Sequence, residues 1–214
     1  MKGLFLNDFY KSKHIMMILL CMISLIGIIV IGLSEQPFIV QAYMVCVTLS
    51  IPICSLTSSY SFDAINWNKY TITFPLKKEK VIQEKYLFSI SFFVVGILIN
   101  TIILLLIINI RGFIFFDFGL KDIITLYCLS TALVFFIYSF YFFLRYIFSL
   151  TDSSFNIIIS IIISICFVGG LIYFFNKFNV SLETGRSILV LGSLLLFLVS
   201  YKINQIFYCR KDID

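Results

Sequence analysis

The residues best suited to chemistry lie in one polar stretch, 61–85, which reads SFDAINWNKYTITFPLKKEKVIQEK. It holds an acid, Asp63, shortly before the only tryptophan of the chain, Trp67, and it ends in a cluster of lysines. Buried aromatic residues often dominate protein interfaces, whereas lysines at the rim add electrostatic attraction. This combination predicts binding chemistry, in which the stretch docks onto a soluble partner.

Catalytic chemistry inside a membrane has residue requirements that the sequence does not meet. A metal-dependent or serine-type site needs histidine at membrane depth, and the one histidine, His14, stands alone. The long apolar runs carry no central Asp or Glu for a carboxylate-based site or an ion-coupled transporter. The six cysteines include no CxxC pair. We expect no catalytic residue, cofactor or metal on this chain; a membrane enzyme with an unrecognised site is the least favoured alternative.

The composition places these residues in a membrane protein. Hydrophobic residues make up 61% of the 214 positions and charged residues 13%, against roughly 25% charged in a soluble domain. The run 15–33 alone covers about 28 Å as a helix, which is close to the hydrocarbon thickness of a bilayer. We therefore predict a single, all-α transmembrane domain over residues 1–214, a bundle of six helices in the lipid bilayer. The expected spans are 15–33, 40–60, 86–110, 123–148, 155–175 and 188–208.

The polar stretch lies between the second and third spans and has its own helix signals. Asp63 is a good N-cap for a short helix over Ala64–Tyr70, and Pro75 suits the first turn of a second helix that runs on into the third span. The alternative is a solvated, positively charged loop with Trp67 anchored at the membrane interface. The predicted partner-contacting residues are Asp63, Ile65, Trp67, Tyr70, Pro75, Lys77, Lys78 and Lys80.

Hydroxyl side chains mark two of the spans. Ser160 and Ser164 lie one turn apart on the same face of the fifth span, so another helix could approach closely there. The second half of the second span is also rich in hydroxyls. Such residues often bond within or between membrane helices, and we favour that packing role over contact with a transported substrate. The candidates for either role are Ser50, Ser55, Ser58, Ser59, Ser160 and Ser164.

The first fourteen residues have two interpretations. In a short amphipathic helix, Phe5, Leu6 and Phe9 would share one side, and the helix would rest in the headgroup layer before the first span. The alternative is a basic tail with scattered apolar residues.

The polar stretch also resembles a known family, the small six-span permeases of bacterial ABC exporters of the second type, which include exporters of peptide toxins, bacteriocins and antibiotics. The similarity extends to the opening Lys2-Gly3-Leu4 and Asp8-Phe9-Tyr10. Two departures are Phe74, where the family usually has Leu, and the missing Pro and Gly near Arg145. The residues of the stretch that carry the resemblance are Asp63, Trp67, Tyr70, Phe74-Pro75, Lys77-Lys78, Val81 and Lys85-Tyr86.

The resemblance implies a mechanism and partners. Two permease chains, identical or different, pair around a pathway in the bacterial cytoplasmic membrane, and each docks its first cytosolic loop on a separate ATPase subunit that holds ATP and Mg²⁺. The cargo would be hydrophobic or amphipathic, and no nucleic acid would be bound. The alternative is a non-transporting immunity or assembly protein that binds a partner through the same loop, 61–85. A neighbouring gene for an ATPase without spans would favour the permease.

The distribution of positive charge predicts the orientation. With six spans, twelve of the sixteen Lys and Arg residues fall on the side of the termini and the 61–85 loop, and positive residues concentrate on the cytoplasmic side. In a Cys-free variant, a cysteine at Asn179 should react with an impermeant maleimide added to intact cells, and one at Asn68 should not. Labelling at Asn68 alone would reverse the orientation.

Overall fold

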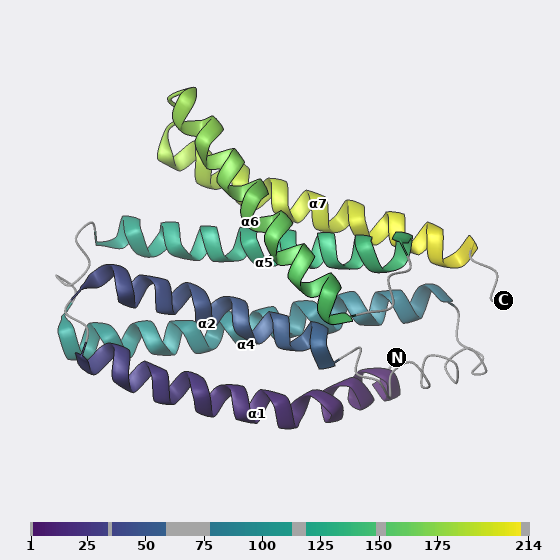
Figure 1. The fold of residues 1–214 in the computed structure, drawn as a ribbon, viewed down its shortest axis with the longest axis horizontal. Helices are drawn as coiled ribbons and strands as arrows, with labels where there is room; N and C mark the ends of the chain where they lie inside the picture. The colour runs from purple at the N-terminus through teal and green to yellow at the C-terminus, as the bar shows by residue number, and fades with distance from the viewer. Residues whose placement is uncertain (1, 34–35, 59–77, 113–118, 149–152, 211–214) are drawn as a thin grey trace.

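The structure is a computed structural model, and it describes all residues except 1, 34–35, 59–77, 113–118, 149–152 and 211–214 (Figure 1). The described residues form six helices, each with a segment long and apolar enough to cross a membrane. The predicted all-α bundle of six spans is therefore confirmed. The helices are α1 (Lys2–Leu33), α2 (Pro37–Ser58), α4 (Lys78–Arg111), α5 (Leu120–Phe148), α6 (Ser153–Lys177) and α7 (Leu182–Arg210).

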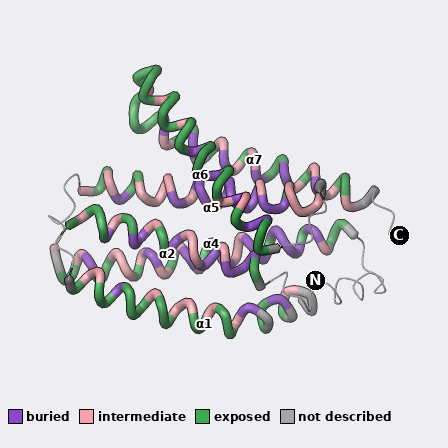
Figure 2. The backbone as a smooth tube through the Cα atoms, viewed as in Figure 1, coloured by how far each residue is buried: buried purple, intermediate pink, exposed green. Residues whose placement is uncertain are grey.

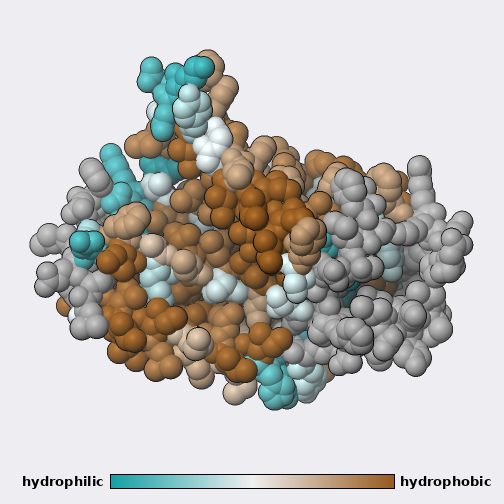
Figure 3. All heavy atoms as spheres, viewed as in Figure 1, coloured by the Kyte–Doolittle hydropathy of each residue, from teal (hydrophilic) through white to brown (hydrophobic). Residues whose placement is uncertain are grey.

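The helices run up and down, so the start of α1 and the end of α7 lie at the same end of the bundle (Figure 1). The end of α2 and the start of α4 lie there too, and we call this the loop end. Buried residues concentrate in α2, α4 and α5, whereas α1 borders the bundle and shows a largely exposed face (Figure 2). Hydrophobic side chains cover much of the visible middle of the molecule, and a polar tip is formed where α6 meets α7 (Figure 3). The shared position of the termini agrees with six spans; the side of the membrane on which they lie stays a prediction.

Helix α7 begins earlier than the sequence predicted. The expected fifth and sixth spans, 155–175 and 188–208, left residues 176–187 between them, but α6 continues to Lys177 and α7 starts at Leu182. The Ser181 hydroxyl accepts a hydrogen bond from the backbone N–H of Thr184 at 3.3 Å, which caps the new helix. Asn179 has a φ of 50°, and asparagine tolerates this left-handed conformation better than most residues. A capped helix can therefore start with polar turns outside the apolar run.

Residues 2–14 are helical, but they do not form a separate short helix, which was one of the two interpretations, because α1 is continuous from Lys2. Leu6 and Phe9 are exposed on this segment, whereas Asp8 is buried. Phe5 meets Phe88 of α4 edge to face, with ring centroids 5.4 Å apart. The long polar N-terminal turns are stabilised by contacts with α4, which hydropathy does not reveal.

Two close approaches fix α2 against its neighbours. Pro52 lies inside α2, and a Cβ on Gly96 of α4 would come within 3.4 Å of its ring, so the glycine lets the helices meet at this point. On the other side, the Tyr43 hydroxyl donates to the backbone carbonyl of Ile23 in α1 at 2.7 Å. That hydroxyl would lie 2.6 Å from a Cβ on Gly27.

A buried aromatic cluster fills the half of the bundle nearest the loop end. Tyr86 of α4 stacks on Phe142 of α5 with centroids 4.3 Å apart, and it also contacts Phe197 of α7 at 5.0 Å. Phe135 joins the same group through Phe197. Such pairs contribute about 0.5–1.5 kcal/mol each beyond the area they bury. This cluster holds α4, α5 and α7 together just below the position where α4 begins.

The contact between α1 and α2 gives a matched pair of predictions. Gly27→Ala should push the Tyr43 hydroxyl away from Ile23, whereas Gly32→Ala on the same helix meets nothing within 4 Å. Both changes gain about 1 kcal/mol of helix propensity, but only the first loses a buried hydrogen bond of about 1 kcal/mol. Thermal unfolding in lipid nanodiscs should therefore rank Gly32→Ala above Gly27→Ala. In a Tyr43→Phe background the difference should shrink; an unchanged difference there would contradict this account.

Candidate coupling site at the base of the central loop

Most of the predicted partner-contacting residues lie outside the part of the chain that the structure describes. These include the predicted short helix over 64–70, together with Asp63, Ile65, Trp67, Tyr70, Pro75 and Lys77. Lys78 is the first residue of α4, and the side chain of Lys80 is exposed in its first turn. The continuation of this helix into the third span is as the sequence predicted. What the structure shows is therefore the base on which the loop stands.

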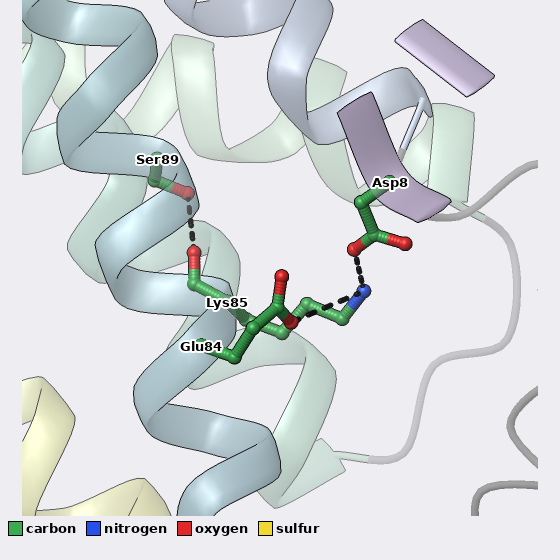
Figure 4. A network of polar contacts seen from close by, with 4 residues as sticks. All are labelled: Asp8, Glu84, Lys85 and Ser89. Carbon is green, nitrogen blue, oxygen red and sulfur yellow. Dashed lines mark hydrogen bonds and ion pairs between the residues drawn. The ribbon is translucent and has the colours of Figure 1, made fainter. Parts of the chain in front are cut away.

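A cluster of charged side chains lies buried at this base (Figure 4). The Lys85 ammonium of α4 forms an ion pair with the Asp8 carboxylate of α1, and it lies 3.9 Å from Oε2 of Glu84. The side chains of Asp8, Glu84 and Lys85 are only 5%, 3% and 10% exposed. The Ser89 hydroxyl donates to the backbone carbonyl of Lys85 at 3.0 Å. The sequence analysis placed Lys85 at the end of the polar stretch, and its pairing with Asp8 was not predicted.

Removing either member of such a pair has a large cost. A buried charge left without its partner destabilises a protein by about 3–5 kcal/mol, because its hydration is not replaced. The Asp8–Lys85 pair therefore fixes the N-terminal turns of α1 against the first turns of α4.

Among the described residues, no group of three His, Cys, Asp or Glu side chains is arranged to hold a metal ion.

The next residue of α4, Tyr86, is bonded to α7. Its hydroxyl accepts from the Asn204 side-chain amide at 2.7 Å and lies 2.9 Å from the Ser200 hydroxyl. Ser200 in turn donates to the backbone carbonyl of Ser139 in α5 at 3.2 Å. The chain of bonds connects α4, α7 and α5 through groups that are all buried. Because the surroundings are apolar, each group left unbonded would carry a desolvation cost.

A second buried tyrosine connects α5 with α2 and α4. The Tyr138 hydroxyl of α5 donates to the backbone carbonyl of Ser89 at 3.0 Å and lies 3.2 Å from the Ser55 hydroxyl of α2. Ser55 also donates to the carbonyl of Pro52 at 2.6 Å. The first three turns of α4 are thus bonded to α1, α5 and α7, and Tyr138 connects them to α2. Movement imposed on the start of α4 would reach all of these helices.

The structure places the predicted hydroxyl residues as follows. Ser160 and Ser164 are fully buried, and each donates back to its own helix, to the carbonyls of Ile157 at 2.8 Å and of Ser160 at 2.6 Å. Ser55 is buried between helices, as described above, whereas the half-buried Ser50 donates to the carbonyl of Val47 at 3.0 Å. The side chain of Ser58 and the whole of Ser59 lie outside the described part.

Sequence reasoning missed the residues that make the base a connected unit, namely Asp8, Glu84, Ser89, Tyr138, Ser200 and Asn204. One signal was present: Asp8 is an isolated acid in an apolar helix, and Lys85 stands where the third span begins. A buried lysine in a membrane protein is usually paired with an acid. The tyrosines gave no signal, because the sequence does not distinguish a hydrogen-bonding tyrosine from one that only packs as an apolar side chain in an aromatic-rich span.

These features define the class of protein. The chain has six helices long and apolar enough to cross a membrane, which makes it a multi-pass membrane protein. The connected polar base lies beneath the loop that is predicted to face the cytosol. The family model described as "ABC-2 family transporter protein" matches residues 3–210, nearly the whole chain. The chain belongs to this family, whose members are the membrane components of transporters and usually work with an ATPase partner. No curated protein and no solved structure matches the chain significantly.

The buried face of α6 gives a prediction. Ser164 lies between Ile157 and Val168 on the face that packs against α5, so a larger side chain there must separate the two helices. Ser164→Leu should lower stability by about 1–3 kcal/mol and reduce export or assembly. Ile165→Leu, on the exposed face of the same helix, is the matched control and should be neutral. The two variants would be compared by thermal unfolding in nanodiscs; wild-type stability of Ser164→Leu would exclude tight packing at this face.

Proposed function

We propose that this chain is the permease subunit of an ATP-driven exporter in the bacterial cytoplasmic membrane. The observation that carries the proposal is the match of the family model to residues 3–210. Within the family, the membrane subunit provides the pathway and does not itself carry out catalysis. ATP and Mg²⁺ would be held by a separate ATPase subunit, and the permease would act as a pair, formed with a second copy or with a related chain.

The proposed contact with the ATPase is the central loop, 61–85. Its support is the resemblance of the sequence there, together with the structure at its base. The loop leads directly into α4, whose first turns are bonded to α1, α5 and α7 through Lys85, Ser89 and Tyr86. A push on the loop by closing ATPase subunits would therefore act on several helices at once. A loop attached to one isolated helix could not distribute force in this way.

The proposed cargo is hydrophobic or amphipathic, such as a peptide toxin, a bacteriocin or an antibiotic. Support comes from the resemblance and from the apolar character of the spans, which offer no central carboxylate or lysine to bind a strongly charged solute. A groove of about 530 Å³ between α1, α2 and α4 is lined almost entirely by aliphatic side chains, with Ser24 and Tyr43 as its polar residues. Such a surface suits hydrocarbon better than a charged ligand.

The loop contact is tested by one aromatic substitution and its control. Trp67→Ala should leave the permease in the membrane but weaken binding of the ATPase about 30-fold, since a buried aromatic anchor contributes about 2 kcal/mol or more. Tyr173→Ala, which removes an aromatic side chain that is 70% exposed on α6, should have no effect. Lys77→Ala combined with Lys78→Ala should cause a smaller, salt-sensitive loss.

Binding would be measured by co-purification from membranes, with mass spectrometry to identify the bound subunit, and by cargo-stimulated ATP hydrolysis. If Trp67→Ala and Asp63→Ala together leave the complex and export unchanged, the loop is only a solvated connection. If the permease retains no ATPase at all, the non-transporting immunity or assembly role is favoured instead.

A further inference from the structure

Two acids share one lysine in the buried cluster at the base of α4. The Lys85 ammonium pairs directly with Asp8 of α1, while the Glu84 carboxylate lies on the other side at 3.9 Å (Figure 4). All three side chains are at least nine-tenths buried. The Lys85 ammonium therefore lies near two carboxylates, one more than a simple ion pair needs.

Glu84 is the unusual member of this cluster. Within the described part of the chain, neither of its carboxylate oxygens has a hydrogen-bond partner. A buried carboxylate without hydrogen bonds is costly and is rarely kept for stability alone. If the cluster served only to attach α1, an aliphatic residue at position 84 would serve better. The position of Glu84 beside Lys85 makes it a second acceptor for the same ammonium group.

The attachment of α1 is weak apart from this cluster. Among the described residues, its specific contacts beyond the ion pair include the Phe5–Phe88 edge contact and the hydrogen bond from Tyr43 to Ile23. Its outer half borders the apolar groove, and much of its remaining surface is exposed. Helix α4 is held much more firmly, through Tyr86 to Ser200 and Asn204 of α7. If the base opens, α1 is the helix that leaves.

We infer that Lys85 exchanges between two carboxylates, Asp8 when the end of α1 is docked on α4 and Glu84 when it is released. In the released state the ammonium stays paired on α4, and Asp8 moves with α1 to the interface, where water can solvate its charge. No buried charge is left unpaired at the end of the exchange, so the barrier imposed by a bare buried lysine is avoided. Glu84 and Lys85 are thus positioning residues that set where α1 sits. The exchange is a property of this chain; its drive by a partner ATPase through the loop rests on the proposed function.

The exchange predicts a change of sign in a double-mutant cycle. With Asp8 present, Glu84→Gln removes a surplus buried carboxylate and should raise the melting temperature. With Asp8→Asn, the same change removes the second carboxylate beside Lys85 and should lower the melting temperature. Both substitutions keep the size of the side chain, and the full-length permease would be measured in nanodiscs. If Glu84→Gln shifts the melting temperature in the same direction in both backgrounds, Glu84 is not an alternative acceptor and the proposal fails.

The position of α1 is followed with spin labels. Cysteines replacing the exposed Leu6 of α1 and Leu87 of α4, in a variant lacking the native cysteines, would carry the labels. Asp8→Asn should raise the fraction of long label distances about tenfold, and Asp8→Glu, which keeps the charge, should restore short ones. Exchanging the charges, with Asp8→Lys and Lys85→Asp, places two acids on α4 opposite the lysine and should hold α1 docked. Unchanged distances in Asp8→Asn would overturn the proposal.

A third experiment tests whether the ATPase drives the exchange. In the complex with the co-purified ATPase, trapping the ATP-bound state should lengthen the label distance with the native cluster but not with Glu84→Gln. If the first two arms hold and this one fails, Lys85 exchanges partners but the ATPase does not drive it. The proposed function would then be revised, while the exchange of Lys85 between Asp8 and Glu84 would stand.

Discussion

The requirement that buried polar groups be bonded to a neighbouring helix governs this structure. Water is absent from the hydrocarbon region, so a hydroxyl, amide or ammonium there must find its partner within the protein. At the start of α4 the Lys85 ammonium and the Tyr86 hydroxyl find partners on α1 and α7, and the backbone carbonyl of Ser89 accepts a bond from Tyr138 of α5. The bonds determine which helices surround α4 and at what height. Aromatic packing around Tyr86 then fills the remaining space.

The same requirement explains why the bundle is held unevenly. Helices α4, α5 and α7 are connected by buried hydrogen bonds and stacked rings, whereas the polar and ring contacts of α1 in the described part of the chain include one buried ion pair, one ring contact and one tyrosine hydroxyl. Apolar surface alone gives little preference for one neighbour over another in a membrane, because lipid is as apolar as the helices. A helix with few polar contacts can therefore move at low cost. The uneven bonding divides the chain into a rigid unit and a peripheral helix.

The two parts of the sequence that resemble the permease family meet in space. The opening segment contributes Asp8, and the end of the polar stretch contributes Lys85 and Tyr86, which lie far apart in the chain but share the base of α4. The resemblance at these positions thus corresponds to one physical contact, a buried charge pair next to a buried tyrosine. This gives a structural reason for both segments to belong to a single pattern, beyond their separate roles as helix ends.

The sequence by itself determined the class and the number of spans, because long apolar runs have few alternatives to crossing a membrane. The sequence did not predict where α1 and α7 begin, because their first turns are polar and hydropathy does not mark them. A contact with α4 stabilises the start of α1, and a cap at Ser181 stabilises the start of α7. Only the tertiary structure decided which face of α1 is buried, and that Lys85 is paired within the protein while Lys80 is exposed. Hydropathy and helical periodicity are properties of one segment at a time. The partner of a buried charge is chosen by packing between segments distant in the chain, and that choice is made only when the helices assemble.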